Sequence, residues 1–293
     1  MTKLFRLLQK AFQELQRNDP LRLAAATAFF TSFALPAILI ILIQVLGMVF
    51  SRRTVGLHML EHLSDIIGAG TVQDLRKTLR NVRHLATSWY IATAGFLFLI
   101  FVATTLFKVI KDSLNQLWDI RIIDKPGVLF ALKLRVRSFV VILLAGFLFT
   151  VVMLAEASMA VLKEYLQEVW RRGHGVLDVI LNQAVSIAVV TTWFAVLFRF
   201  LPDGRPRWKV AFTGGFFTAL LFTCGKLILG VLLSYSNMQT IYGASTSMVL
   251  MLLFVFYSSF IFYYGACFTK VWAQHVNAPI KPGRYTVQYN EKN

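Results

Sequence analysis

Six long runs of apolar residues dominate this chain and limit what it can fold into. No charged residue lies between Arg22 and Arg52, and Lys226 is the only one between Lys209 and Lys270. A helix of about 20 apolar residues spans the roughly 30 Å hydrocarbon layer of a membrane and satisfies its own backbone hydrogen bonds there. We therefore predict an all-α, polytopic membrane protein with six transmembrane helices. The predicted spans are 23–50, 88–107, 138–162, 179–198, 208–233 and 245–272.

The distribution of Lys and Arg sets the orientation predicted for these spans. An even number of spans places both termini on one side, which carries 20 of the 30 Lys and Arg residues, whereas the other side carries nine. Basic residues collect on the cytoplasmic side of membrane proteins, so both termini are predicted to be cytoplasmic. The net charge of +16 thus indicates topology and contact with anionic lipid headgroups, and no nucleic-acid partner is predicted.

The segments outside the spans are short, which predicts a single membrane domain over residues 22–272. Residues 1–21 contain an amphipathic stretch, typical of a helix that lies along the cytoplasmic membrane surface. The external segment 51–87 has the periodicity of two short amphipathic helices. Residues 273–293 are predicted to form a cytoplasmic tail.

Two ionisable residues fall well inside the predicted spans, Glu156 and Lys226. Each comes 18 positions after the first residue of a span that starts on the cytoplasmic face, which is about 27 Å along a helix. Gln44, Asn182 and Gln183 fall in the same outer half of the membrane. We predict a polar cavity open to the external side, with Glu156 and Lys226 near its floor. The alternative is that Glu156 lies at a span end and Lys226 extends outward to the headgroups.

Pro36 lies inside the first predicted span. Proline removes a backbone donor and can kink a helix, which in transporters sometimes exposes carbonyl groups to a substrate. Because proline is common in transmembrane helices, a kink that serves packing is the favoured interpretation.

A weak enzyme signal lies in the external segment, where His58, Glu61 and His62 spell HxxEH. In inverted zinc proteases this spacing offers two imidazoles and a general base to one metal ion. A third ligand and a walled cleft are also needed, and the surroundings offer only Asp65. A solvated polar face is therefore favoured, and no catalytic residue, metal site or cofactor is predicted.

Four segments together resemble the YihY/BrkB family of bacterial inner-membrane proteins, formerly labelled ribonuclease BN. Span 1 contains AAATAFFTSFALPAILIIL (24–42), and FKVIKDSLNQLWDI (107–120) is similar to the family's Leu-Asn-x-x-Trp signature. The stretch 201–233, LPDGRPRWKVAFTGGFFTALLFTCGKLILGVLL, resembles its basic turn and Gly-rich fifth helix with a Gly-Lys pair. The stretch 241–266, IYGASTSMVLMLLFVFYSSFIFYYGA, resembles its sixth helix.

This resemblance implies a multi-pass protein of the bacterial inner membrane, discussed in connection with serum resistance, lipid transport and envelope integrity, without an established catalytic site. It implies that Lys226, at the family's Gly-Lys position, faces the helix bundle. Two departures stand out. Cys267 follows the Gly-Ala of the sixth helix, where the family usually has an acid, and the region of Ser245 lacks the usual second glycine after Tyr-Gly.

The function expected is that of a non-enzymatic transporter or flippase-like protein for phospholipid or another anionic amphipathic envelope molecule. Membrane lipids are the expected partners, and a homo-oligomer or an envelope protein partner is left open. One alternative is a scaffolding protein for envelope assembly that docks through 51–87, and another is a zinc-dependent membrane hydrolase using 58–62. The predicted substrate-binding residues are Lys226, Glu156, Asn182, Gln183, Gln44 and Tyr242.

Overall fold

The computed structural model describes residues 2–46, 60, 64, 70, 72, 73, 76, 77, 89–122, 175–235, 246–283 and 286–289. Most of them form helices, as predicted. The long helices are α1 (Thr2–Gln16), α2 (Pro20–Leu46), α5 (Trp89–Leu117), α7 (Gly175–Phe200), α8 (Trp208–Tyr235) and α10 (Thr246–His275). The last five overlap five predicted spans. The predicted span 138–162 lies outside the described residues, as does most of the external segment 51–87.

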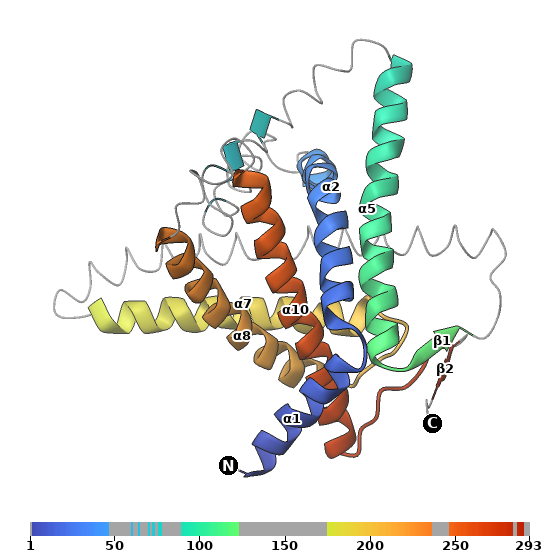
Figure 1. Ribbon diagram of the computed structural model, residues 1–293, viewed down its shortest axis with the longest axis vertical. Coiled ribbons are helices and arrows are strands. Elements are labelled where there is room, and N and C mark those ends of the chain that lie inside the picture. Colours follow the sequence, from blue (N-terminus) through green and yellow to red (C-terminus); the bar gives the residue numbers. More distant parts are fainter. Residues whose placement is uncertain are drawn as a thin grey trace.

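Figure 1 shows how the helices follow one another across the molecule. Helix α2 lies between α5 and α10, and α8 packs on another side of α10. We call one end of the molecule the polar end: α2 and α8 begin there, at Pro20 and Trp208, and α5 and α10 end there, at Leu117 and His275. Neighbouring helices therefore alternate in direction, as the predicted spans do. Helix α1 and both chain termini lie at the polar end.

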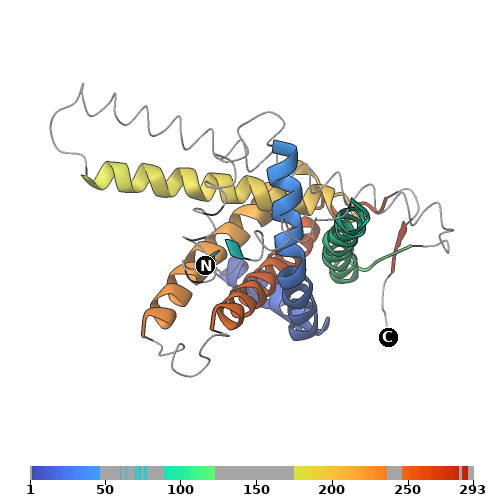
Figure 2. The ribbon, with the colours of Figure 1, turned by 90° about the horizontal axis from the view of Figure 1, so that it is seen from above.

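Helix α7 runs crosswise to α2 and α5 in both views (Figures 1 and 2). It packs on α8, and Gly215 allows this close approach because its missing side chain leaves room for the backbone of Thr191 and Ala195. The prediction placed 179–198 beside the other spans. The crosswise course of α7 differs from that predicted arrangement. The full six-span topology stays a prediction.

The apolar helices keep much of their surface uncovered. Among the described residues, Trp208–Gly230 and Met248–His275 are long and apolar enough to cross a membrane, and only 28% of the most apolar window of each is buried. On α8, an exposed apolar or aromatic side chain recurs every fourth residue, at Trp208, Phe212, Phe216 and Leu220, which we call the α8 stripe. Water-soluble proteins rarely expose such continuous apolar surface, so this distribution indicates contact with lipid.

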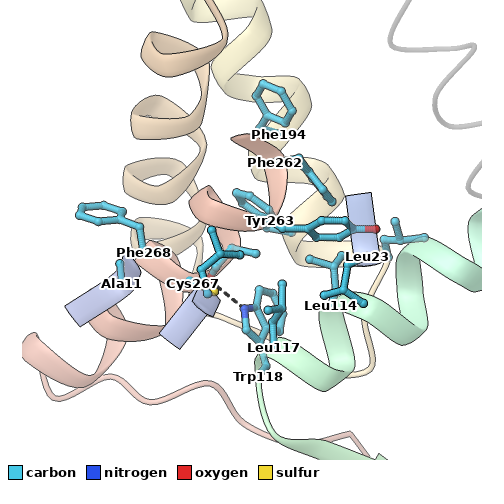
Figure 3. Packing of buried hydrophobic residues seen from close by; sticks show 14 of the residues in the cluster. Ala11, Leu23, Leu114, Leu117, Trp118, Phe194, Phe262, Tyr263, Cys267 and Phe268 are labelled. Atoms are coloured by element: carbon cyan, nitrogen blue, oxygen red, sulfur yellow. Dashed lines mark hydrogen bonds between the residues drawn. The ribbon is translucent and has the colours of Figure 1, made fainter. Parts of the chain in front are cut away.

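A buried core lies toward the polar end, where α1, α2, α5, α7 and α10 meet (Figure 3). Aromatic rings fill the junction between α7 and α10, where Phe198 stacks on Phe262 with ring centroids 5.2 Å apart. Offset and tilted ring pairs of this kind add to the energy of apolar burial. The core residues labelled in Figure 3 are Ala11, Leu23, Leu114, Leu117, Trp118, Phe194, Phe262, Tyr263, Cys267 and Phe268.

A two-stranded antiparallel sheet closes the polar end, which the all-α prediction did not include. Strand β1 (Ile120–Ile122) pairs with β2 (Thr286–Gln288), so that Ile120 lies opposite Gln288. Asp119 turns the chain from α5 into β1 with a φ of 53°, a left-handed conformation that Asp adopts more readily than most residues. Its carbonyl accepts a hydrogen bond of 2.6 Å from the backbone N–H of Tyr289.

Candidate functional site

Two of the predicted substrate-binding side chains are described. Lys226 lies on α8 and its side chain is exposed, beside Leu227 and Ile228, which are 66% and 57% exposed. Gln183 lies on α7 and is also exposed. The resemblance implied that Lys226 faces the helix bundle. The structure instead places its side chain at the exposed surface of an apolar helix.

The remaining predicted residues are only partly described. Pro36 and Gln44 lie within α2, which continues as a helix through Leu46, and Asn182 lies within α7. Glu156, Tyr242 and the zinc-motif residues His58, Glu61 and His62 lie outside the described residues. The meeting of Glu156 with Lys226 and the polar cavity accordingly stay predictions, and the alternative of a zinc site at 58–62 stays open. Within the described part of the chain, no group of three or more His, Cys, Asp or Glu residues could hold a metal ion.

The structure brings together a different charged group, at the polar end. The ammonium group of Lys270 on α10 lies 3.0 Å from Oε2 of Glu14 on α1 and 2.7 Å from Oδ2 of Asp119 after α5. The Lys270 side chain is only 8% exposed. A buried ammonium group needs paired negative charge to offset its lost hydration. The three residues therefore tie α1, α5 and α10 to one another.

A second ion pair fixes residues 201–207, which link α7 to α8 and which we call the connector. Nζ of Lys111 lies 2.9 Å from Oδ2 of Asp203, and both side chains are largely buried. Asn115 holds Asp203 twice: its side-chain amide donates to Oδ2, and its Oδ1 accepts from the Asp203 backbone N–H, both at 2.9 Å. The connector is thereby attached to the last turns of α5.

Asp112 stands beside this second pair. Surrounding protein atoms remove part of the hydration of its carboxyl group, which raises its pKa above the usual value. Repulsion from Asp203 acts in the same direction, while Lys108 and Lys111 oppose it. The ionised form of Asp112 is thus less favourable in the folded protein than in the unfolded chain.

Neutral hydrogen bonds also join elements at the polar end, including α2. The indole N–H of Trp118 donates to the carbonyl of Ala266 at 3.0 Å, as the dashed line in Figure 3 shows. The hydroxyl groups of Tyr263 and Thr27 lie 2.5 Å apart, linking α10 to α2. Buried polar groups are costly unless they are paired in this way. The last three turns of α10 are consequently bound to α2 and α5 by side chains as well as by apolar packing.

Sequence reasoning missed this polar-end group because it treated charges next to the spans as indicators of topology. One local signal was available: Lys111, Asn115 and Asp119 recur every fourth residue, which places them on one face of a helix. The partner of Lys270, Glu14, is 256 residues away in the chain, so no local pattern could reveal that pair.

Cys267, the residue that replaces the acid expected from the resemblance, is fully buried three residues before Lys270. The carboxylates that face Lys270 come instead from Glu14 and Asp119. The negative charge near this part of α10 is thus supplied by other segments.

Long apolar helices with exposed apolar faces, bound together at one charged end, define a helical membrane protein. The family model for virulence factor BrkB matches residues 11–287, and the chain belongs to this family. Its curated relatives are named UPF0761 membrane proteins. One from Psychrobacter sp. (strain PRwf-1) is 26% identical over 245 residues, covering 83% of this chain and 44% of the relative.

Two further relatives match the chain at a similar identity. The chain is 26% identical to the protein of Pseudomonas paraeruginosa over 83% of its own length and 57% of the relative. It is 25% identical to the protein of Teredinibacter turnerae over 93% of its own length and 61% of the relative. The chain thus spans about half the length of the curated relatives it matches. No solved structure matches it.

Proposed function

We propose that this protein is a non-enzymatic transporter or flippase-like protein of the bacterial inner membrane, acting on phospholipid or another anionic amphipathic envelope molecule. In this proposal the chain crosses the membrane six times, both termini are cytoplasmic, and loss of the protein impairs envelope integrity. The proposal is supported by membership of a membrane-protein family and by apolar helices whose surfaces are open to lipid.

The observation that carries the proposal is the position of Lys226. Its side chain is exposed on the same part of α8 as the apolar side chains of Leu227 and Ile228. A charge that faces lipid inside the hydrocarbon layer is costly, and in this proposal Lys226 lies about 27 Å along α8, near the outer headgroups. An anionic headgroup that reaches this position would offset the cost, while its acyl chains stay beside the apolar helix surface.

A neutral hydrogen-bonding group stands close to the same position. Gly225 of α8 lies against the hydroxyl group of Tyr257 on α10, and a side chain at Gly225 would overlap that hydroxyl. Tyr257 therefore approaches α8 one residue before Lys226. In the proposed mechanism, Lys226 binds the headgroup and Glu156 adjusts the charge of Lys226 or exchanges a proton with it. Neutral groups of Tyr242, Asn182, Gln183 and Gln44 orient the ligand.

The test is a lipid-scrambling measurement with the purified protein in liposomes containing a fluorescent phosphatidylglycerol. Wild type should accelerate exchange between leaflets, and Lys226→Met should lower the rate at least about tenfold because the headgroup loses its charged partner. Lys226→Arg, which keeps the charge, should retain most of the rate. Glu156→Gln should change the rate in the same assay.

Lys281→Met is the matched control, because Lys281 is an exposed lysine at the polar end. It removes the same charge from the chain and should scramble like wild type. Folded wild-type protein that leaves exchange at the rate of empty liposomes would refute the proposed function. Equal rates for wild type and Lys226→Met would remove Lys226 from it.

A further inference from the structure

We propose that the connector and the start of α8 form a binding site for an anionic phospholipid of the leaflet at the polar end. The phosphate group is held by Arg205, Arg207 and Lys209, and an acyl chain lies along the α8 stripe. This site is separate from Lys226, which lies about 27 Å further along the same helix. It does not depend on the proposed transport function.

The inner side of the connector is fixed in place. Pro202, Gly204 and Pro206 are buried. Gly204 packs against side chains of β1 and of the residues after α10, and Arg205 donates its backbone N–H to the carbonyl of Lys281 at 2.9 Å. Together with the Asp203 contacts to α5, these interactions hold the backbone. The backbone of the site would therefore lose little conformational entropy on binding a ligand.

The outer side of the connector carries positive charge. Arg205 and Arg207 of the connector and Lys209 in the first turn of α8 are all exposed, and they alternate with the buried Pro206 and the exposed Trp208. Within the described ranges, the structure pairs none of the three with a carboxylate. Each basic residue near an anionic membrane surface strengthens association about fivefold. Three of them on one rigid segment suit a phosphate group.

Trp208 marks the boundary between the charged segment and the apolar helix surface. Its ring stacks on Phe212 with centroids 5.8 Å apart, and the guanidinium of Arg199 lies 5.7 Å from its centroid. Arg199 also donates to the carbonyl of Pro206. Tryptophan is enriched where headgroups meet acyl chains. Trp208 thus places the three basic residues at headgroup level and the rest of the stripe at acyl-chain level.

The ligand chemistry follows from this arrangement. A phosphate alone would use the basic residues and leave the stripe uncovered, whereas a zwitterionic lipid would cover the stripe and bring no net negative charge. A phospholipid with net negative charge, such as phosphatidylglycerol, satisfies both parts.

Native mass spectrometry of the full chain in detergent tests the proposal, with equimolar phosphatidylglycerol and phosphatidylcholine added. Wild type should retain phosphatidylglycerol preferentially. A triple variant, Arg205→Gln with Arg207→Gln and Lys209→Gln, should lose at least about tenfold of that preference while binding phosphatidylcholine as before. Raising the salt concentration should weaken the wild-type preference.

The matched control changes three exposed basic residues of α1, as Lys3→Gln with Arg6→Gln and Lys10→Gln. It removes the same charge and should keep the preference. Equal losses in the two triple variants would show a diffuse charge effect and overturn the site, as would a connector variant that keeps the wild-type preference. If the connector variant unfolds, the pair Arg205→Lys with Arg207→Lys should retain the preference and the single Arg207→Gln should lower it.

Glycerol 3-phosphate distinguishes the source of the phosphate. A millimolar concentration should leave the retained phosphatidylglycerol unchanged, because the free headgroup gains nothing from the stripe. Displacement of the lipid at that concentration would assign the three residues to a soluble phosphate ligand and overturn the proposal.

Discussion

Lys270 lies where three segments meet, and its ammonium group faces Glu14 of α1 and Asp119 at the end of α5. Glu14 and Asp119 are far apart in the sequence, and both contact this one lysine. Asp119 also supplies the left-handed turn into β1. One residue therefore combines a backbone role with a charge role.

Replacing Lys270 with Met should destabilise the protein by about 1 to 3 kcal/mol, because two partly buried carboxylates lose their cation. The measurement is the unfolding of purified protein in detergent. Lys281→Met is the control, and a Lys270 variant as stable as that control would contradict the assignment. In a double-mutant cycle, Glu14→Gln should cost less in the Lys270→Met background than in wild type.

The raised pKa of Asp112 gives a pH-dependent prediction. The folded protein favours the protonated carboxyl, so ionisation of Asp112 lowers stability as the pH rises from below 3.8 through the raised value. Asp112→Asn should therefore raise the melting temperature at pH 7, and this gain should vanish below about pH 4. Asp119→Asn, which removes a carboxylate from Lys270 but keeps the left-handed turn accessible, should lower the melting temperature at pH 7.

At the scale of the helices, α8 and α10 cross through a reciprocal pair of contacts. Gly214 of α8 lies against the side chain of Thr269, and Gly265 of α10 lies against that of Thr218. Each threonine hydroxyl donates to the carbonyl of the glycine four residues earlier in its own helix, at 2.7 Å. Small residues at such crossings let helix backbones approach closely in membranes.

Gly214→Ala and Gly265→Ala should each destabilise the protein by about 1 to 3 kcal/mol, because an added methyl group overlaps the facing threonine. Gly230→Ala is the control on the same helix, since nothing lies within 4 Å of the methyl group it adds. It should be neutral or stabilising by up to about 1 kcal/mol. Thermal unfolding in detergent compares the three variants, and equal effects would exclude the tight crossing.

The helices were predictable from sequence because charge-free apolar runs of this length have few alternatives. The crosswise course of α7 was not, since apolar content alone does not say which helix a span packs against. Lys226 attracts attention as a lone charge within an apolar run. The role of Lys270 could not be predicted in this way, because a lysine near the end of a span resembles an ordinary residue at headgroup level. Only the structure places its distant partner Glu14 beside it.

For the whole molecule, both termini lie at the polar end, where α1 and the β1–β2 pair are found. The excess of Lys and Arg predicts that this end faces the cytoplasm. Green fluorescent protein fused to either terminus should therefore fluoresce, and alkaline phosphatase fused there should be inactive. Fusion after Gly70, in the predicted external segment, should give the reverse. Active phosphatase at both termini would invert the topology.

The pairing of β1 with β2 bears on how the protein is made. The ribosome synthesises β1 before α7, α8 and α10, and it synthesises β2 after all three. The sheet can therefore form only after the three intervening helices have been synthesised. Until then the edge of β1 has no partner, and unpaired strand edges are places where nascent chains associate wrongly. The order of translation makes this small sheet one of the last parts of the polar end to assemble.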